Sequence, residues 1–227
     1  QLETLRRAVR LSNRIQSALP HFGTWLARKV LFKKVRAQAL GTELMYCISG
    51  GGFIRPETLE LMNGLGYGLR NGYGMTETGI LSVELSNRAS RRNSGTVGLP
   101  LSAVGDGGYR ISPEGLLEVR APLLYTAQIV DGVRIERDPA AWFTTGDCFR
   151  VDKTGRWYIT GRRGDLIIGA NGENLSPDLI EQRLDLHAGL ASCVFGMEVE
   201  GDERPVLLIQ VPSVDDAYAC ASAAQAA

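Results

Sequence analysis

The most constraining feature of the sequence is a short apolar run, a helix signature and a second apolar run, in that order. The run 44–48 precedes the glycine-rich turn 49–52. Residues 55–62 follow with a proline in the first turn, which is typical of a helix start. The run 67–70 has the character of the next strand. This order predicts a βαβ unit with a parallel strand pair over residues 44–80.

Residues 71–79 read Asn-Gly-Tyr-Gly-Met-Thr-Glu-Thr-Gly. The stretch is too rich in glycine for a helix interior and too polar for a core strand. The sequence therefore predicts a loop that leaves the carboxyl end of the strand 67–70. Ligands bind at that edge in open α/β sheets, so this loop is the first candidate for a binding site.

A different pattern begins at about residue 94. Short alternating runs separated by Gly- and Asp-containing turns predict an antiparallel meander or small barrel over 94–160. Its expected strands are 116–120, 127–130, 147–151 and 156–160. After residue 161 we expect a strand at 166–168, a helix that begins at Ser176-Pro177, and strands at 192–199 and 205–211.

Charge and cysteine usage limit the partners. Residues 1–40 hold nine Lys or Arg and one acid, although the whole chain has zero net charge. We expect helices here, broken at 20–23, with a solvated basic face over a buried stripe; contact with a membrane surface is the alternative. The stripe would comprise Trp25, Leu26, Val30, Leu31 and Val35.

Four dispersed cysteines and two histidines disfavour a zinc site or a disulfide framework and suit a reducing cytosol.

Four stretches, together with the βαβ unit and the meander, resemble the adenylate-forming superfamily. This superfamily includes acyl-CoA synthetases, adenylation domains of peptide synthetases and luciferases. The resemblance covers about residues 30–211 and is strongest to the long-chain acyl-CoA synthetases. The stretches are Ser49-Gly50-Gly51-Gly52; Tyr73-Gly74-Met75-Thr76-Glu77-Thr78; Thr145-Gly146-Asp147; and Gly161-Arg162, followed by Asp165 and Gly172-Glu173-Asn174-Leu175-Ser176-Pro177.

The resemblance implies a function and an architecture. Family enzymes activate a carboxylic acid with ATP as an acyl-adenylate and pass the acyl group to a thiol, usually coenzyme A. The implied α/β fold is the end of a doubly wound parallel sheet, then an antiparallel small barrel, then a truncated small α+β domain. Residues 1–160 would be the C-terminal part of the large domain, and 161–227 the hinge and the small domain.

The resemblance also assigns roles near the first motifs. Tyr73 would stack on adenine, and the catalytic Thr76 would offer its hydroxyl to the α-phosphate, where charge develops during acyl transfer. The catalytic Glu77 would be the protein ligand of Mg²⁺. Glycines there would let the backbone approach the nucleotide closely. The remaining nucleotide-binding residues of this part are Gly50, Gly51, Gly52, Asn71, Gly72 and Gly74.

The later motifs complete the implied site. Asp147 would accept hydrogen bonds from both ribose hydroxyls, and Arg162 would reach the ribose and the phosphates. Gly164 stands at the hinge, where the family usually has Asp or Lys. Gly172 matches the glycine that lets pantetheine pass. ATP or AMP, Mg²⁺ and coenzyme A are therefore the expected cofactors and substrates.

Two elements of the family pattern do not occur. No phosphate loop ending in Pro-Lys-Gly precedes residue 49, and the last lysine is Lys153, so the C-terminal catalytic lysine is absent. The sequence thus predicts a piece of a cytoplasmic synthetase that partners the remainder of the same enzyme and cannot complete adenylation alone. The alternatives are a module that loads a carrier protein and a non-catalytic nucleotide-binding homologue. Nucleic-acid binding rests only on the basic N-terminal segment and is not expected.

Overall fold

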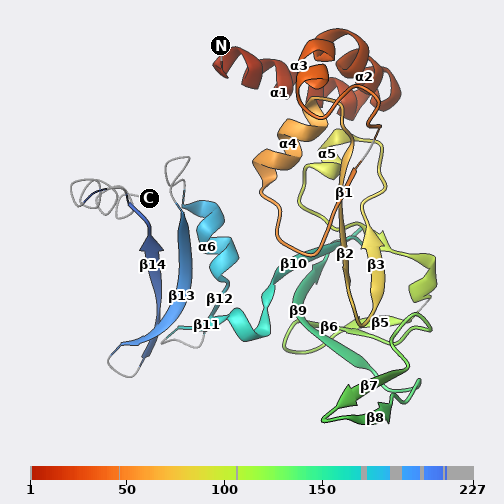
Figure 1. Cartoon of the computed structure of the whole chain (residues 1–227), viewed down its shortest axis with the longest axis vertical. Helices are drawn as coiled ribbons and strands as arrows, with labels where there is room; N and C mark the ends of the chain where they lie inside the picture. The colour runs from red at the N-terminus through yellow and green to blue at the C-terminus, as the bar shows by residue number, and fades with distance from the viewer. Residues whose placement is uncertain are drawn as a thin grey trace. The chain divides into compact units, whose positions relative to one another are not determined.

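The computed structural model describes residues 2–45, 47–105, 107–169, 173–184, 191–199, 202–211 and 213, without the side chains of Gln182, Arg183 and Asp202. The fold is mixed α/β with several separate sheets, as the sequence predicts (Figure 1). The chain divides into two compact units. The first unit comprises 1–110, 118–143 and 150–159; the second comprises 111–117, 144–149 and 160–227. The predicted domain boundary at 160/161 stays a prediction.

The first unit begins with a helical segment. Its helices are α1 (Leu2–Ala18), α2 (Pro20–Leu26), a π-helical turn (Ala27–Leu31) and α3 (Lys33–Gln38). Among the described residues, no helix is both long enough and apolar enough to cross a membrane.

The predicted buried stripe in this segment is wrong for three of its five residues, whereas Leu26 and Val35 are half-buried and Val35 packs against the core cluster of the helices. Trp25, Val30 and Leu31 are 52%, 58% and 45% exposed. The buried positions are instead Ala27 and Phe32, which belong to the core cluster of the helices. The π turn, in which the Phe32 amide donates to the Ala27 carbonyl, changes the helical phase. A sequence projection at 3.6 residues per turn therefore places the wrong side chains inward.

The central sheet of the first unit has the order β1-β2-β3-β4. Strands β1 (Cys47–Ser49) and β2 (Leu69–Met75) are parallel and are joined by helix α4 (Pro56–Gly64), so the predicted βαβ unit is confirmed. Strand β3 (Gly79–Val83) pairs antiparallel with β2 and with β4 (Leu99–Pro100). The short helix α5 (Ala89–Arg92) lies between β3 and β4 in the chain.

The predicted loop over 71–79 is wrong for its first half. Strand β2 runs on to Met75, and only residues 76–78 form a turn before β3. The error has a physical cause: the glycines that argue against a strand are the residues that let β2 and β3 approach each other, as the site geometry shows.

A second sheet has the order β10-β9-β6-β5. It contains β5 (Tyr109–Ile111), β6 (Leu116–Val119), β9 (Phe143–Val151) and β10 (Trp157–Arg162). Strands β7 (Ala127–Val130) and β8 (Val133–Glu136) form a separate antiparallel hairpin. The β7–β8 hairpin confirms the antiparallel prediction for that pair, and the described strands do not close into a barrel, so the small barrel is not confirmed.

The second unit carries two small antiparallel pairs. Strand β11 (Ile167–Ile168) pairs with β12 (Asn174–Leu175), and β13 (Ser192–Val199) pairs with β14 (Asp202–Ile209). Helix α6 (Pro177–Arg183) begins after Ser176, as the sequence predicts.

Arg36 connects the helical segment to the chain around the βαβ unit. The residue is 0% exposed, and its guanidinium lies 4.0 Å from the centre of the Tyr67 ring. It donates hydrogen bonds to the carbonyls of Leu44 (2.8 Å) and Thr42 (3.2 Å). Arg36 thereby holds the segment before β1 against the residue that leads into β2.

We predict that Arg36→Ala lowers the free energy of unfolding by about 2–4 kcal/mol, because it leaves buried carbonyls without a donor and removes the stacking on Tyr67. Lys34→Ala, at an exposed position of the same helix, should change it by less than about 0.5 kcal/mol. Urea unfolding followed by circular dichroism measures both. Equal losses would show that α3 contributes through helix propensity and not through Arg36.

Candidate functional site

Two glycine-containing segments that are distant in the sequence lie side by side at the end of β1. Ser49, the last residue of β1, is in register with Asn71 of β2. A Cβ added at Gly50 would lie 3.4 Å from the carbonyl oxygen of Gly72. Gly51 has φ +79°, a conformation that favours glycine. The structure therefore brings Gly50 of the predicted glycine turn against Gly72, directly before the motif Tyr73–Thr78.

The glycines of β2 allow close approach to β3. A Cβ at Gly72 would lie 3.1 Å from the Ser82 carbonyl oxygen. One at Gly74 would collide with the Gly79 carbonyl oxygen and come within 2.8 Å of the Ile80 Cα. A bulge between Tyr73 and Gly74 shifts the register of the pair. These two glycines consequently have a packing role, whatever ligand they also approach.

The turn that follows presents two polar side chains to solvent. Thr76 and Glu77 are exposed, and the Glu77 carbonyl accepts a hydrogen bond of 2.9 Å from the Tyr125 amide. Thr78 is 0% exposed; its hydroxyl donates to the Gly79 carbonyl (2.9 Å) and accepts from the Met75 amide (3.3 Å). The sequence analysis gave Thr78 no role, yet this buried hydroxyl holds the turn that displays Thr76 and Glu77.

Tyr73 is only 7% exposed. Its hydroxyl lies 4.0 Å from the sulfur of Met75. A purine could stack on this ring only after the side chain or its cover moves. Adenine stacking by Tyr73 stays a prediction.

Asp147 and Arg162 face each other in the second unit. The Asp147 carboxylate lies 3.7 Å from Nε of Arg162, and their side chains are 18% and 63% exposed. Thr145 accepts from the Asp147 amide at 3.2 Å and donates to the Leu117 carbonyl at 3.0 Å. Gly146, at φ +81°, forms the sharp backbone turn between Thr145 and Asp147. An ion pair of this length, with a largely exposed arginine, contributes little to stability. Arg162 can therefore leave Asp147, and each side chain can bind a polar ligand instead.

The thiol next to this pair is poorly suited to nucleophilic chemistry. Burial, and next the charge of Asp147, raise the pKa of Cys148, whereas Arg163 lowers it. Cys148 therefore stays a thiol near neutral pH. Asp147 and Arg162 are therefore suited to binding a polar ligand through hydrogen bonds and charge.

The Mg²⁺ ligand Glu77 and the glycines expected to serve coenzyme A, Gly164 and Gly172, stay predictions. Among the described residues, no group of three or more His, Cys, Asp or Glu could hold a metal ion. A single exposed carboxylate such as Glu77 still fits Mg²⁺, which is commonly held by one or two carboxylates plus the oxygens of substrate phosphates. Gly172 lies outside the described residues. Gly164 lies in a 3₁₀ turn (Arg163–Asp165), with open space where its Cβ would be.

The sequence analysis missed a buried ion pair in the first unit. Nε of Arg156 lies 3.0 Å from the carboxylate of Glu84, which is 2% exposed. Glu84 also accepts a hydrogen bond of 2.7 Å from the Ser86 amide. The signal in the sequence is an acidic residue directly after the apolar strand 79–83, but its partner comes 72 positions later.

Comparison with known proteins identifies relatives. Residues 8–105 match the family described as AMP-binding enzyme. The long-chain-fatty-acid–CoA ligase FadD15 of Mycobacterium bovis is 31% identical over 181 residues, which cover 79% of this chain and 28% of that protein. Human long-chain-fatty-acid–CoA ligase ACSBG1 is 31% identical over 199 residues, which cover 84% of this chain and 26% of that protein. The chain thus spans less than a third of the length of either relative.

Solved structures show the same fold. The o-succinylbenzoate CoA synthetase MenE from Bacillus subtilis, in complex with the acyl-adenylate OSB-AMP, matches with TM-score 0.60 and 27% identity over 76% of this chain and 38% of that chain. The same enzyme in complex with AMP matches with TM-score 0.60 and 25% identity over 80% of this chain and 39% of that chain.

We predict that Gly74→Ala lowers the free energy of unfolding by about 2 kcal/mol or more, because the methyl group must displace the β3 backbone. Gly52→Ala is the matched control: nothing lies within 4 Å of the added Cβ, and the change should cost less than about 0.5 kcal/mol. Thermal and urea unfolding measure the difference. Similar values for the two variants would contradict the packing role of Gly74.

Proposed function

We propose that the chain, whose residues 8–105 match the AMP-binding enzyme family, binds the adenylate of an ATP-dependent fatty-acid–CoA ligase reaction. In that reaction ATP activates a fatty acid as acyl-adenylate, and the acyl group passes to coenzyme A. The observation that carries the proposal is the contact of Gly50, directly after β1, with Gly72 of the parallel strand β2, which leads on to the exposed Thr76 and Glu77. This edge of a parallel sheet is the usual ligand site of α/β folds.

In this proposal each side chain acts through its own chemistry. The hydroxyl of Thr76 donates to the α-phosphate, on which charge builds up as the acyl group is transferred. Asp147 accepts hydrogen bonds from the ribose hydroxyls. Arg162 leaves its ion pair with Asp147 and donates to a phosphate oxygen instead. The backbone at Gly50, Gly51 and Gly52 borders the adenine and the acyl group without side-chain bulk.

Glu77 would hold Mg²⁺ together with nucleotide phosphates. The bound ion would neutralise phosphate charge during the reaction. Gly164 and Gly172 would serve the second half-reaction, as the freely rotating hinge and as the passage for the pantetheine of coenzyme A. In the whole synthetase, β1 and β2 would be the end of a doubly wound parallel sheet.

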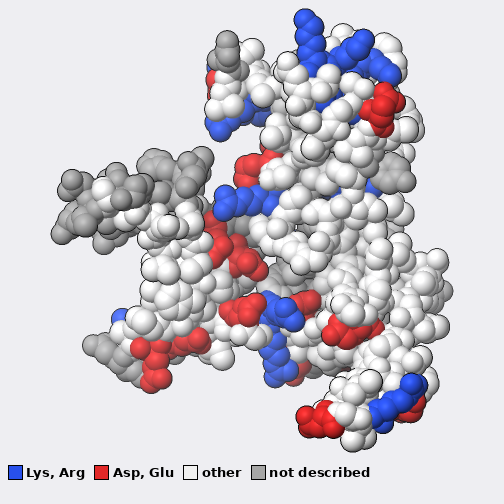
Figure 2. Space-filling model, viewed as in Figure 1, with Lys and Arg blue, Asp and Glu red and all other residues white. Residues whose placement is uncertain are grey.

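We also propose a cytoplasmic enzyme that contacts a membrane peripherally, which would suit an apolar substrate. The stacked pair Phe22 and Trp25 is 54% and 52% exposed. Lys and Arg side chains gather over the same N-terminal helices, at the top of Figure 2. Exposed aromatics beside basic residues are typical of surfaces that bind anionic lipid interfaces.

The proposal is tested by ATP–pyrophosphate exchange, assayed on the chain and on the longest reading frame that encodes it. The panel contains short, medium, long and aromatic carboxylates and amino acids. Exchange with fatty acids on the longer product supports the proposal. Exchange with amino acids, or acyl transfer to carrier phosphopantetheine in preference to coenzyme A, would favour the carrier-loading alternative. Silence of a folded protein across the panel would favour a non-catalytic homologue.

We predict that Asp147→Asn weakens AMP binding about tenfold or more, because the ribose hydroxyls lose a charged acceptor. Glu198→Gln, an exposed carboxylate on β13, is the control and should leave the affinity unchanged. Isothermal titration calorimetry of AMP measures both. Unchanged affinity in Asp147→Asn would remove this residue from the site.

We predict that Gly52→Trp reduces binding of the acyl chain more than binding of AMP, because the indole would fill space that the proposal gives to the acyl group. The measurement compares affinities for AMP and for a non-hydrolysable fatty acyl-adenylate. Equal losses of both would contradict the placement of Gly52 at the acyl side.

A further inference from the structure

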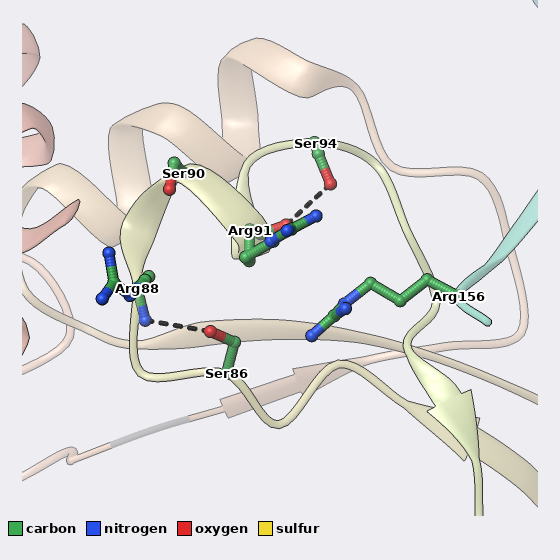
Figure 3. Close-up of a pocket in the computed structure, with 6 residues that line it drawn as sticks. All are labelled: Ser86, Arg88, Ser90, Arg91, Ser94 and Arg156. Atoms are coloured by element: carbon green, nitrogen blue, oxygen red, sulfur yellow. Dashed lines mark hydrogen bonds between the residues drawn. The ribbon is translucent and has the colours of Figure 1, made fainter. Parts of the chain in front are cut away.

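A polar pocket of about 550 Å³ lies in the first unit, around the segment 86–94. Its lining contains only arginine and serine: Ser86, Arg88, Ser90, Arg91, Ser94 and Arg156. Figure 3 shows Arg91 and Arg156 reaching from different parts of the chain toward the middle of the pocket, with the serines around them. No lining residue belongs to the proposed adenylate site.

Positive charge exceeds negative charge around this pocket. Arg70 and Arg92 lie behind the lining and donate to the Ser86 carbonyl, each at 3.2 Å. The nearby carboxylates are Glu84, which pairs with Arg156, and Asp152, which accepts from the Arg156 amide. Five arginines therefore face two carboxylates, and both acids already accept hydrogen bonds.

Arg92, next to the lining, is a buried cation. Burial, and then the charges of Arg70 and Arg28, lower the pKa of Arg92 to about 10. Arg92 is still a cation at neutral pH, and it is 3% exposed. A bound anion would offset the excess of positive charge around the pocket.

The lining groups can donate toward the pocket. Within the described part of the chain, the Arg91 guanidinium makes no hydrogen bond or ion pair. The Ser86 hydroxyl accepts from the Arg88 amide at 3.1 Å, so its own proton remains to be donated. Nη1 of Arg88 makes only a long contact of 3.4 Å with the Ser17 carbonyl. The lining thus offers forked N–H donors and hydroxyl protons.

We propose that this pocket binds the diphosphate group of a small molecule, either as free pyrophosphate or as part of a nucleoside diphosphate. Guanidinium groups match phosphate oxygens through paired hydrogen bonds, and serine hydroxyls complete such sites. The volume lies within the range of small-molecule pockets, and the wall is too polar for an apolar ligand. This site is separate from the proposed adenylate site and does not depend on the proposed function.

Titration calorimetry of the chain with inorganic pyrophosphate, with ADP and with acetate tests the proposal. Pyrophosphate should bind, acetate should not, and added salt should weaken the binding. Arg91→Gln should weaken pyrophosphate binding about tenfold or more. This variant removes no described structural contact, so its melting temperature should match that of the wild type. Tighter binding of ADP than of pyrophosphate, lost in Arg91→Gln, would identify a nucleotide as the ligand.

Arg134→Gln is the matched control. Arg134 is 67% exposed on the β7–β8 hairpin and is paired with Glu136, so its loss should not change pyrophosphate binding. Absence of pyrophosphate binding by the folded wild-type chain would overturn the proposal. Equal weakening in Arg91→Gln and Arg134→Gln would also overturn it, because the binding would then be a diffuse effect of net charge.

Discussion

The parallel pairing of β1 with β2 is the constraint on which the first unit depends. A parallel pair requires a crossover, which α4 supplies, and the crossover must be covered. Helix α1 packs on α4, and Arg36 stacks on Tyr67 at the entrance to β2. The same pairing places Gly50 against Gly72 and directs the chain from both strands to one edge of the sheet.

Glycine has two roles at this edge, and the structure separates them. At Gly72 and Gly74 a side chain would strike the backbone of β3, so these positions are fixed by packing. At Gly52 there is open space and no unusual backbone angle, so packing gives no reason for glycine. A ligand that approaches the backbone closely supplies such a reason, and this supports the adenylate site at the Gly50–Gly52 turn.

The sequence correctly predicted those elements that are determined by residues close together in the chain. The βαβ unit, the strand 127–130 and the start of α6 follow from apolar runs, turn residues and a proline at a helix start. The exposed Val30 and Leu31 were mispredicted because they lie in a π turn, which alters the helical phase. Residues 71–75 were mispredicted because glycine in a strand requires a close neighbour that the sequence does not reveal. The motif residues could be named from resemblance, but the buried pair Glu84–Arg156 joins segments too distant for any pattern to connect.

The most direct test of the proposed adenylate site is an amide NMR spectrum of the chain titrated with AMP. The account predicts chemical-shift changes at the amides of Gly50, Gly51 and Gly52, at 71–77, and at Asp147. These changes should saturate together with one dissociation constant. A well-dispersed spectrum that AMP leaves unchanged, or that changes only over 86–94, would contradict the account.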